Sequence, residues 1–288
     1  MDENSRSLDI PDVSDWTSDE FTQAPGIRRK LWLMEPGTGT RALFKIPKDN
    51  TGEAWGEQVT CALGRRLGFD TANTKIAVYN RQLGSLSENF VSLSEELFQG
   101  GDLLSLSNAE FDRSRLAGYD IGAILTALET VELDRDFLSI PVFDALVANQ
   151  DRHCDNWGVI RDANGSYRLA PLYDSGCSLG HLIPESALDS FFRDKQRTTG
   201  FMRQGKSMIG LPGAEKPKFL ALLSHIRKRH EADLKPWIER VASMRTEHSR
   251  AAVNDIPDDL MSEKRKEFTC KLLSLRQTWL IDWWKGQT

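Results

Sequence analysis

The sequence predicts an α+β fold in two lobes, the first rich in β-strands and the second mostly helical. Short alternating apolar segments with turn residues between them dominate up to about residue 98, and helix-period apolar patterns dominate afterwards. The glycine pair in "FQGGDLL" separates the two regions, and 288 residues suffice for two cores. We therefore expect a flexible acidic tail over residues 1–20, a first lobe over 21–98 and a second lobe over 99–288.

Composition excludes several classes of protein. The chain is 40% hydrophobic and 27% charged, has no run of about 18 apolar residues, and starts with an acidic segment unlike a signal peptide. Its four cysteines lack CxxC spacing, which indicates free thiols in a reducing compartment. The net charge of −5 argues against direct binding to nucleic acid. We expect a cytoplasmic protein with no membrane partner.

The first lobe begins with a predicted β-hairpin. The first 20 residues carry seven acids and one arginine, which predicts a mobile tail that Trp16 could anchor. From Arg29 the segments "RKLWLM" and "RALFKIP" flank the turn "EPGTGT" and form the hairpin. A helix follows over residues 51–67, and short strands are expected at "TKIAVY" and "NFVSLS".

One lysine and one glutamate of this lobe could form a pair. Leu43 and Lys45 share a face of their strand, so both could line a cleft. In the next helix, Asn50 as N-cap and Glu53 would form a capping box, which leaves Glu57 to pair with Lys45. The alternative is that Glu57 is exposed, because it lies opposite the apolar stripe of its helix.

The second lobe contains the polar stretch "ANQDRHCDNWGVI", which follows an apolar helix-like run. Asn164-Gly165 between "WGVIR" and "YRLAPLY" predicts a second hairpin. That hairpin brings Asn156, just before its first strand, to the same end as Asp174, just after its second strand. Asp151 lies five residues before Asn156, so two carboxylates and one amide should converge there.

This set of side chains suits phosphoryl transfer. A carboxylate can orient the acceptor hydroxyl, while hard oxygen ligands hold Mg²⁺ against nucleotide phosphates. The spacing D-x-x-x-x-N in "DRHCDN" matches the catalytic loop of protein kinases, and "DSG" stands where their metal-binding D-F-G would follow. The alternative is that Asp151 and Asn156 only cap turns. The glycine-containing segment "APGIRRK" would offer backbone N–H groups to phosphates, whereas "PGTGT" is better explained as the hairpin turn.

Together these segments resemble the HipA-like serine/threonine kinases, the toxins of bacterial toxin–antitoxin modules. The resemblance rests on "FDALVANQDRHCDNWGVI", "YRLAPLYDSGCSLG", "GIRRKLWL", "ALFKIP", "EAWGEQVTCALGRRLGF" and "FQGGDLL", and it covers about residues 22–245. It implies a two-lobed protein-kinase-like fold in which Asp151 is catalytic, Asn156 and Asp174 bind Mg²⁺, and His153 orients the loop. The residues expected to bind ATP are Gly26, Arg28, Lys30, Lys45, Glu57, Glu95, Leu97, Asn156 and Asp174.

The implied activity is that of an ATP- and Mg²⁺-dependent serine/threonine protein kinase. Resemblance also implies a protein substrate such as an aminoacyl-tRNA synthetase, and a possible antitoxin partner. Two features depart from full-length HipA: the chain is too short for its N-terminal subdomain, and Thr22 is the only hydroxyl near the position of its autophosphorylated serine. The chain is therefore closer to the compact, HipT-like members, and that mode of control is in doubt.

Three alternatives compete with this interpretation. A small-molecule or lipid kinase would use the same Asp/Asn/Asp geometry, and a pseudokinase binding module would keep the fold without the chemistry. A zinc site is the third alternative, although adjacent histidine and cysteine are unlike the usual ligand spacing. Its ligands would be His153, Cys154, Cys177 and His181. The C-terminal apolar stripe is expected to be core rather than a partner groove; it comprises Phe268, Leu272, Leu275, Trp279 and Trp283.

Overall fold

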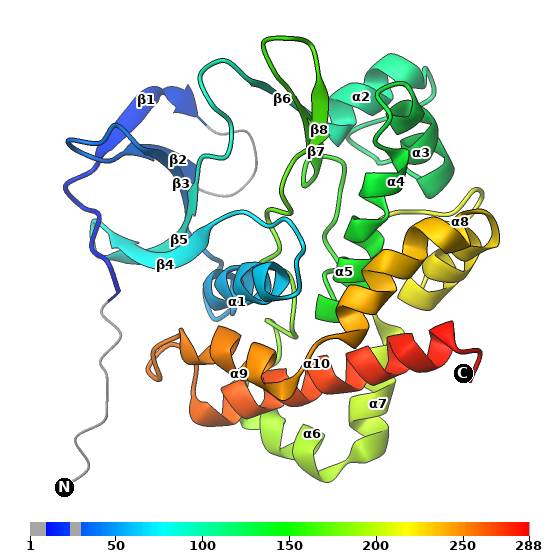
Figure 1. Cartoon of the computed structure of the whole chain (residues 1–288). Helices are drawn as coiled ribbons and strands as arrows, with labels where there is room; N and C mark the ends of the chain where they lie inside the picture. The colour runs from blue at the N-terminus through cyan, green and yellow to red at the C-terminus, as the bar shows by residue number, and fades with distance from the viewer. Residues whose placement is uncertain (1–9, 24–29, 288) are drawn as a thin grey trace, which may run out of the picture.

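A computed structural model describes residues 10–23 and 30–287 of the chain (Figure 1). In this part of the chain the first lobe is built on an antiparallel five-stranded sheet in the order β1-β2-β3-β5-β4. Its strands are β1 (Thr17–Gln23), β2 (Lys30–Met34), β3 (Arg41–Lys45), β4 (Thr74–Tyr79) and β5 (Gln82–Glu88). The β2–β3 hairpin is the predicted one, and its register places Lys30 opposite Lys45.

Residues 10–20 are not a tail, so this prediction was wrong for them. Val13 is buried, Asp12 pairs with Val78, and β1 adds an edge strand beside β2. Trp16 packs against the small apolar core of the sheet, as an anchor should. The acidic composition misled because Asp12 caps a turn, where its carboxylate accepts the Ser14 amide at 2.9 Å. The lobe boundary at residue 98 stays a prediction.

Helix α1 (Glu53–Arg66) packs against β4 and β5 and, away from the sheet, against α9 (Thr246–Asn254). Both sides of α1 are therefore covered. The predicted capping box is absent from this described helix: its N-cap is Gly52, and Asn50 has a φ of 59°. The Glu53 carboxylate instead accepts the backbone N–H of Lys48 at 3.1 Å.

The strand expected over residues 89–94 was also wrong, because those residues form a loop and the strand β5 precedes them. The sequence of β5, "QLGSLSE", is polar for a buried strand. Its serines are satisfied inside the protein: Ser85 donates to Glu57 at 2.8 Å, and Thr74 donates to Ser87 at 3.1 Å. A polar strand can therefore lie under a helix that carries a buried carboxylate.

The second lobe combines a small sheet with a group of helices (Figure 1). The sheet has the order β6-β7-β8, and Gly165, with a φ of 83°, turns the predicted β7–β8 hairpin. The three strands are β6 (Glu96–Gln99), β7 (Gly158–Arg161) and β8 (Tyr167–Leu169). Besides α9, the helices are α2 (Gly100–Ser107), α3 (Ile121–Glu129), α4 (Asp134–Phe137), α5 (Ser139–Val147), the 3₁₀ helix η1 (Glu185–Ala187), α6 (Leu188–Arg193), α7 (Lys195–Gln204), α8 (Phe219–Ala242) and α10 (Glu263–Trp284).

Helix α5 is the element that positions the polar loop. All nine of its residues are buried, and it packs against α8 and α10. It ends at Ala148, whose φ of 58° turns the chain sharply into the segment 149–157. The C-terminal stripe on α10 is core, as predicted, with Leu275 the only partly buried member. Among the described residues, no helix has the length and apolar content that a membrane span requires.

Candidate active site

A cleft of about 730 Å³ lies between the first sheet and the β6–β7–β8 sheet. This is the size of a typical small-molecule site. Five of the predicted nucleotide-binding residues line it: Lys30, Lys45, Glu95, Leu97 and Asp174. Glu57, Asp151 and Asn156 lie outside this lining, while Gly26 and Arg28 fall outside the described residues.

Lys45 occupies the inner end of the cleft and contacts two carboxylates. Its Nζ lies 2.5 Å from Oε1 of Glu57 and 3.3 Å from Oδ1 of Asp174. Lys45 is 7% exposed and Glu57 is 3% exposed, so the predicted pair forms and Glu57 does not face solvent. Burial by itself lowers the pKa of Lys45, but Asp174 and Glu57 together raise it above the ordinary value. The ammonium group is therefore charged at neutral pH.

Lys30 brings a second cation to the same carboxylate. Residues opposite each other on antiparallel strands point to the same face, so Lys30 and Lys45 both face the cleft. The Nζ of Lys30 lies 3.4 Å from Oδ2 of Asp174. Asp174 itself has a φ of 54°, in the left-handed region that aspartate tolerates better than most residues. This end of the cleft therefore holds one carboxylate between two ammonium groups.

Ser85 holds the carboxylate oxygen of Glu57 that Lys45 does not contact. Its hydroxyl donates to Oε2 of Glu57 at 2.8 Å, while Lys45 engages Oε1. Both oxygens of the Glu57 carboxylate are therefore engaged. This fixes the orientation of the carboxylate and, through it, the position of the Lys45 ammonium group. Sequence reasoning did not identify Ser85. The available signal was a serine on the strand neighbouring Lys45, where β5 pairs Ser85 with Lys45 directly.

The loop after α5 holds Asp151 through two asparagines. The Asn156 side-chain N–H donates to the backbone oxygen of Asp151 at 2.7 Å, and the Asp151 N–H donates to Asn149 Oδ1 at 3.2 Å. The Cys177 thiol donates to Oδ2 of Asp151 at 3.5 Å. Asp151 and Asn156 thus lie side by side, as the D-x-x-x-x-N spacing predicted.

Arg152 is the residue that joins this loop to the segment before Asp174, and sequence reasoning missed it. It is 1% exposed and forms a bidentate pair with Asp144 of α5, at 3.0 and 2.8 Å. Its remaining donors reach the backbone oxygens of Asn156 and Tyr173 at 2.5 and 2.7 Å, and Ser175 Oγ at 3.1 Å. A carboxylate inside the otherwise apolar run "FDALV" was the signal, because a buried carboxylate requires a partner.

Ion pairs at the outer end of the cleft hold its rim. Arg113 bonds Asp102 and Asp155, each at 2.6 Å. The Glu95 carboxylate accepts the Ser92 amide at 2.9 Å and bonds Arg168 at 3.1 Å, and the amide contact in particular lowers its pKa. The side chain of Glu95 is therefore engaged within the rim.

The residues weighed as a zinc site do not form one group. Within the described part of the chain, His153 and Cys154 cluster with Asp155, whereas Cys177 and His181 cluster with Glu53. The zinc site of His153, Cys154, Cys177 and His181 was therefore wrong. The first two residues lie in the loop after α5, the last two lie in the segment after Asp174, and each pair clusters with a different acidic residue.

A strand-rich lobe and a helical lobe that enclose a lysine–glutamate pair define a protein-kinase-like fold. The chain belongs to the HipA-like C-terminal domain family, whose model matches residues 22–243. It is 25% identical to the serine/threonine-protein kinase CtkA of Helicobacter pylori over 245 residues, 81% of this chain and 72% of that protein. The predicted α+β, two-lobed fold and the resemblance to the family are both confirmed.

Solved structures show the same fold. The Helicobacter pylori proinflammatory kinase CtkA superposes with a TM-score of 0.81 at 20% identity, covering 95% of this chain and 96% of that one. The HipA, HipB and operator DNA complex of a Shewanella oneidensis toxin–antitoxin system gives a TM-score of 0.59 at 14% identity, covering 92% of this chain and 65% of that one.

Proposed function

We propose that this chain is an ATP- and Mg²⁺-dependent serine/threonine protein kinase with Asp151 as its catalytic carboxylate. The observation that carries the proposal is the convergence of Lys45, Glu57 and Asp174 at the inner end of the cleft. Family membership and the name of the CtkA relative support the same reaction.

In this proposal the first lobe positions the nucleotide. Lys45, held by Glu57, contacts the phosphates, and Lys30 adds a second positive charge on the same face. The segment containing Gly26 and Arg28 supplies further contacts to phosphate. The base lies against Leu97, and since the Glu95 side chain is engaged by Arg168, residue 95 contributes through its backbone.

The second lobe holds the metal and the acceptor. The amide oxygen of Asn156 and the carboxylate of Asp174 are hard donors that suit Mg²⁺. When bound, the ion neutralises charge on the phosphates during transfer. Asp151 accepts or orients the proton of the acceptor hydroxyl, and Asn149 and Asn156 hold its backbone in place for that role.

The acceptor and the partners are proposed from the names of the relatives and from the family resemblance. The CtkA relative is named a serine/threonine kinase, which favours a protein substrate; an aminoacyl-tRNA synthetase is the example that the family resemblance implies. The Shewanella oneidensis HipA structure, a complex with HipB, motivates a search for an antitoxin partner. The net charge of −5 supports a chain that does not itself bind nucleic acid, and cysteines without CxxC spacing support action in a reducing compartment such as the cytoplasm.

The test is transfer of labelled γ-phosphate from ATP. The wild-type chain should label protein substrates rather than metabolites or lipid vesicles, and Asp151→Asn should lower the rate by roughly 10²–10⁴ because the charge that orients the proton is lost. Binding of Mg·ATP should change little, because Asn156 and Asp174 are retained. The exposed Asp136→Asn serves as the matched control.

Three results would contradict the proposal. Transfer by Asp151→Asn at the parental rate would remove Asp151 from the reaction. Preferential labelling of metabolites or lipids by the wild type would favour the small-molecule or lipid kinase instead. An absence of transfer by the wild type to any acceptor, with nucleotide still bound, would favour a pseudokinase.

A further inference from the structure

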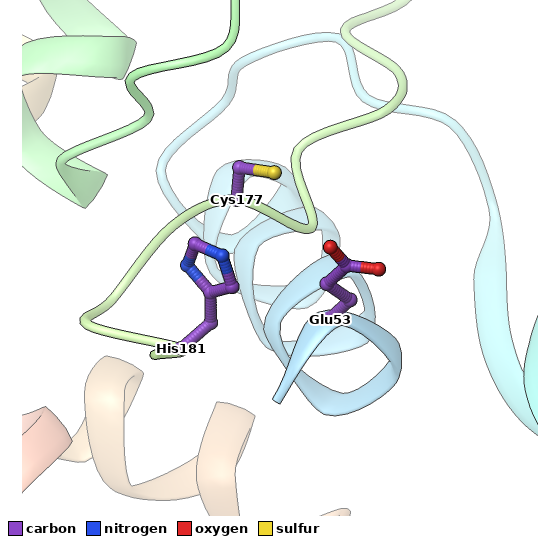
Figure 2. Close-up of side chains that lie close together, drawn as sticks. All are labelled: Glu53, Cys177 and His181. Atoms are coloured by element: carbon purple, nitrogen blue, oxygen red, sulfur yellow. The ribbon is translucent and has the colours of Figure 1, made fainter. Parts of the chain in front are cut away.

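Three side chains of different chemistry meet beside the proposed catalytic site. Ligand atoms of Glu53, Cys177 and His181 all lie within 4.8 Å of one another. Figure 2 shows that they come from two segments: Glu53 from the first turn of α1, and Cys177 and His181 from the segment that follows Asp174. A carboxylate, a thiol and an imidazole are the three ligand types that Zn²⁺ takes in proteins.

Backbone contacts hold the two segments together. The Gly52 N–H donates to the His181 backbone oxygen at 2.9 Å. A Cβ on Gly56 would lie 2.9 Å from the Gly176 oxygen, and a Cβ on Gly176 would lie 2.9 Å from the Glu53 oxygen, so only glycine permits this approach. The cluster therefore rests on two elements whose separation is fixed, which favours a preorganised site.

An ion could reach this cluster from solvent. His181 lines a groove of about 310 Å³ together with Gly52, Trp55 and Glu185. Cys177 is half-buried, whereas the other three cysteines, Cys61, Cys154 and Cys270, are buried. Cys177 is thus the thiol that a metal ion or an alkylating reagent reaches most easily.

We propose that Glu53, Cys177 and His181 bind one Zn²⁺ ion, and that the bound ion inhibits the reaction at Asp151. Three protein ligands leave one coordination position open, as in zinc sites that also bind water or another group. The Cys177 thiol loses its proton to solvent when the ion binds, because the thiolate is the ligand.

The second cluster, His153, Cys154 and Asp155, is a poorer site. Burial raises the pKa of the Cys154 thiol to about 12, which opposes the thiolate that a metal requires. Asp155 is already bonded to Arg113 at 2.6 Å. His153, the third member of this poorer cluster, therefore provides a matched control for the proposal.

Inhibition follows from the position of Cys177. Its sulfur lies 3.5 Å from Oδ2 of Asp151 and donates to that oxygen. Metal binding removes this donor and places a divalent cation beside Oδ2 of Asp151, so the ion attracts this oxygen and competes with the acceptor hydroxyl for it. Glu53 is also one turn of α1 away from Glu57, the residue that pairs with Lys45. An ion bound to Glu53 is therefore attached to the helix that positions Lys45. This inhibitory part rests on the proposed kinase function, whereas the binding does not.

Binding is tested on the full chain without nucleotide, by titrating zinc chloride in competition with a chromophoric chelator. We expect one ion per chain, with Cys177→Ser and His181→Ala each weakening affinity roughly tenfold or more. The matched control His153→Ala should keep the wild-type affinity. Zinc should also protect Cys177 of the wild-type chain, but not of His181→Ala, from alkylation by iodoacetamide, read by mass spectrometry.

Inhibition is tested with Mg·ATP present, as the fraction of each protein's own zinc-free rate. Zinc should inhibit wild type and His153→Ala, and His181→Ala should resist. Binding that His153→Ala abolishes, or that His181→Ala leaves unchanged, would overturn the site. Binding at the cluster without inhibition would overturn the inhibitory role. A wild type that transfers no phosphate but binds zinc in the expected variant pattern would contradict the kinase proposal alone.

Discussion

Two buried ion pairs, Lys45–Glu57 and Arg152–Asp144, lie on either side of the inter-lobe cleft and differ in how completely they are satisfied. Arg152 uses all five of its N–H donors within the protein, two on Asp144 and three on neighbouring groups. Lys45 reaches Glu57 and Asp174, and it lines a cleft of ligand size. The Arg152–Asp144 pair is therefore fully satisfied within the protein, whereas the Lys45–Glu57 pair borders a cleft that a ligand can enter.

The difference teaches that burial alone does not distinguish a pair that is enclosed by the protein from a pair that a ligand can reach. Both pairs are less than a tenth exposed. The guanidinium of Arg152 is planar and fixes several groups at once, whereas the ammonium of Lys45 is a point charge that a phosphate can also engage. We therefore expect that breaking the first pair affects chiefly folding, and that breaking the second affects chiefly transfer.

The largest effect on stability is expected for Arg152→Met. The change leaves the Asp144 carboxylate buried without its cation, which should cost about 3–5 kcal/mol of unfolding free energy. Urea unfolding measures this, with the exposed Arg115→Met as a control expected to change stability by about 0–1 kcal/mol. Equal midpoints for the two variants would show that Arg152 does not organise the loop.

Next in size is the effect of Lys45→Met on phosphate transfer. Loss of one preorganised positive group should lower the rate roughly 10²–10³-fold. The cost to stability should be smaller than for Arg152→Met, because Ser85 still bonds Glu57. Initial rates of transfer compared with those of the exposed Lys75→Met test this. A Lys45→Met protein that unfolds as readily as Arg152→Met would make the two pairs equivalent.

A smaller effect is expected for Glu57→Gln, because the amide still occupies the space and Asp174 still attracts Lys45. If Glu57 acts through Lys45, the double variant should transfer phosphate at nearly the rate of Lys45→Met alone. A double-mutant cycle on transfer rates measures this. Additive losses would show that Glu57 acts independently of Lys45.

The smallest effect is expected from pH. The pKa of Lys45 in the folded state is raised above its ordinary 10.5. Its pair therefore stabilises the fold fully below pH 10.5, and that contribution is lost only as pH rises through the higher folded pKa. The difference in unfolding free energy between wild type and Lys45→Met should be constant from about pH 7 to about pH 9. A change in this free-energy difference between about pH 7 and about pH 9 would show that the Lys45 ammonium group is not paired with Glu57 and Asp174 as in the structure.

The parts of the site that could be predicted were those encoded by short spacing. The proximity of Asn156 to Asp151 follows from the spacing of the loop, and the hairpin turn at Gly165 is recognisable from the Asn164-Gly165 pair, whereas the joint role of Asp151, Asn156 and Asp174 in one site stays a prediction. Lys45 follows from alternation along one strand. In such local patterns the sequence spacing alone determines which side chains share a face or an end of an element, so no knowledge of the tertiary packing was required.

The parts that could not be predicted depend on packing between distant segments. The pairing of Glu57 with Lys45 was predicted, but the helical wheel also allowed an exposed Glu57, because its burial comes from the sheet that α1 lies against. The strand β5 looked too polar because Ser85 finds its partner on that helix. No sequence pattern identified Arg152, because its role depends on Asp144 and on two backbone oxygens that only the folded chain brings together.

The backbone at Asp174 has a consequence for which residues the position can hold. Its φ of 54° costs most side chains free energy, and glycine, asparagine and aspartate tolerate it best. Glycine would relieve the backbone fully, yet the position holds the one member of this group that carries a charge. The chain therefore retains a strain that a one-residue change would remove. Glycine would also leave Lys45 and Lys30 without the carboxylate that both of them contact, so two ion pairs hold an aspartate here against the preference of the backbone.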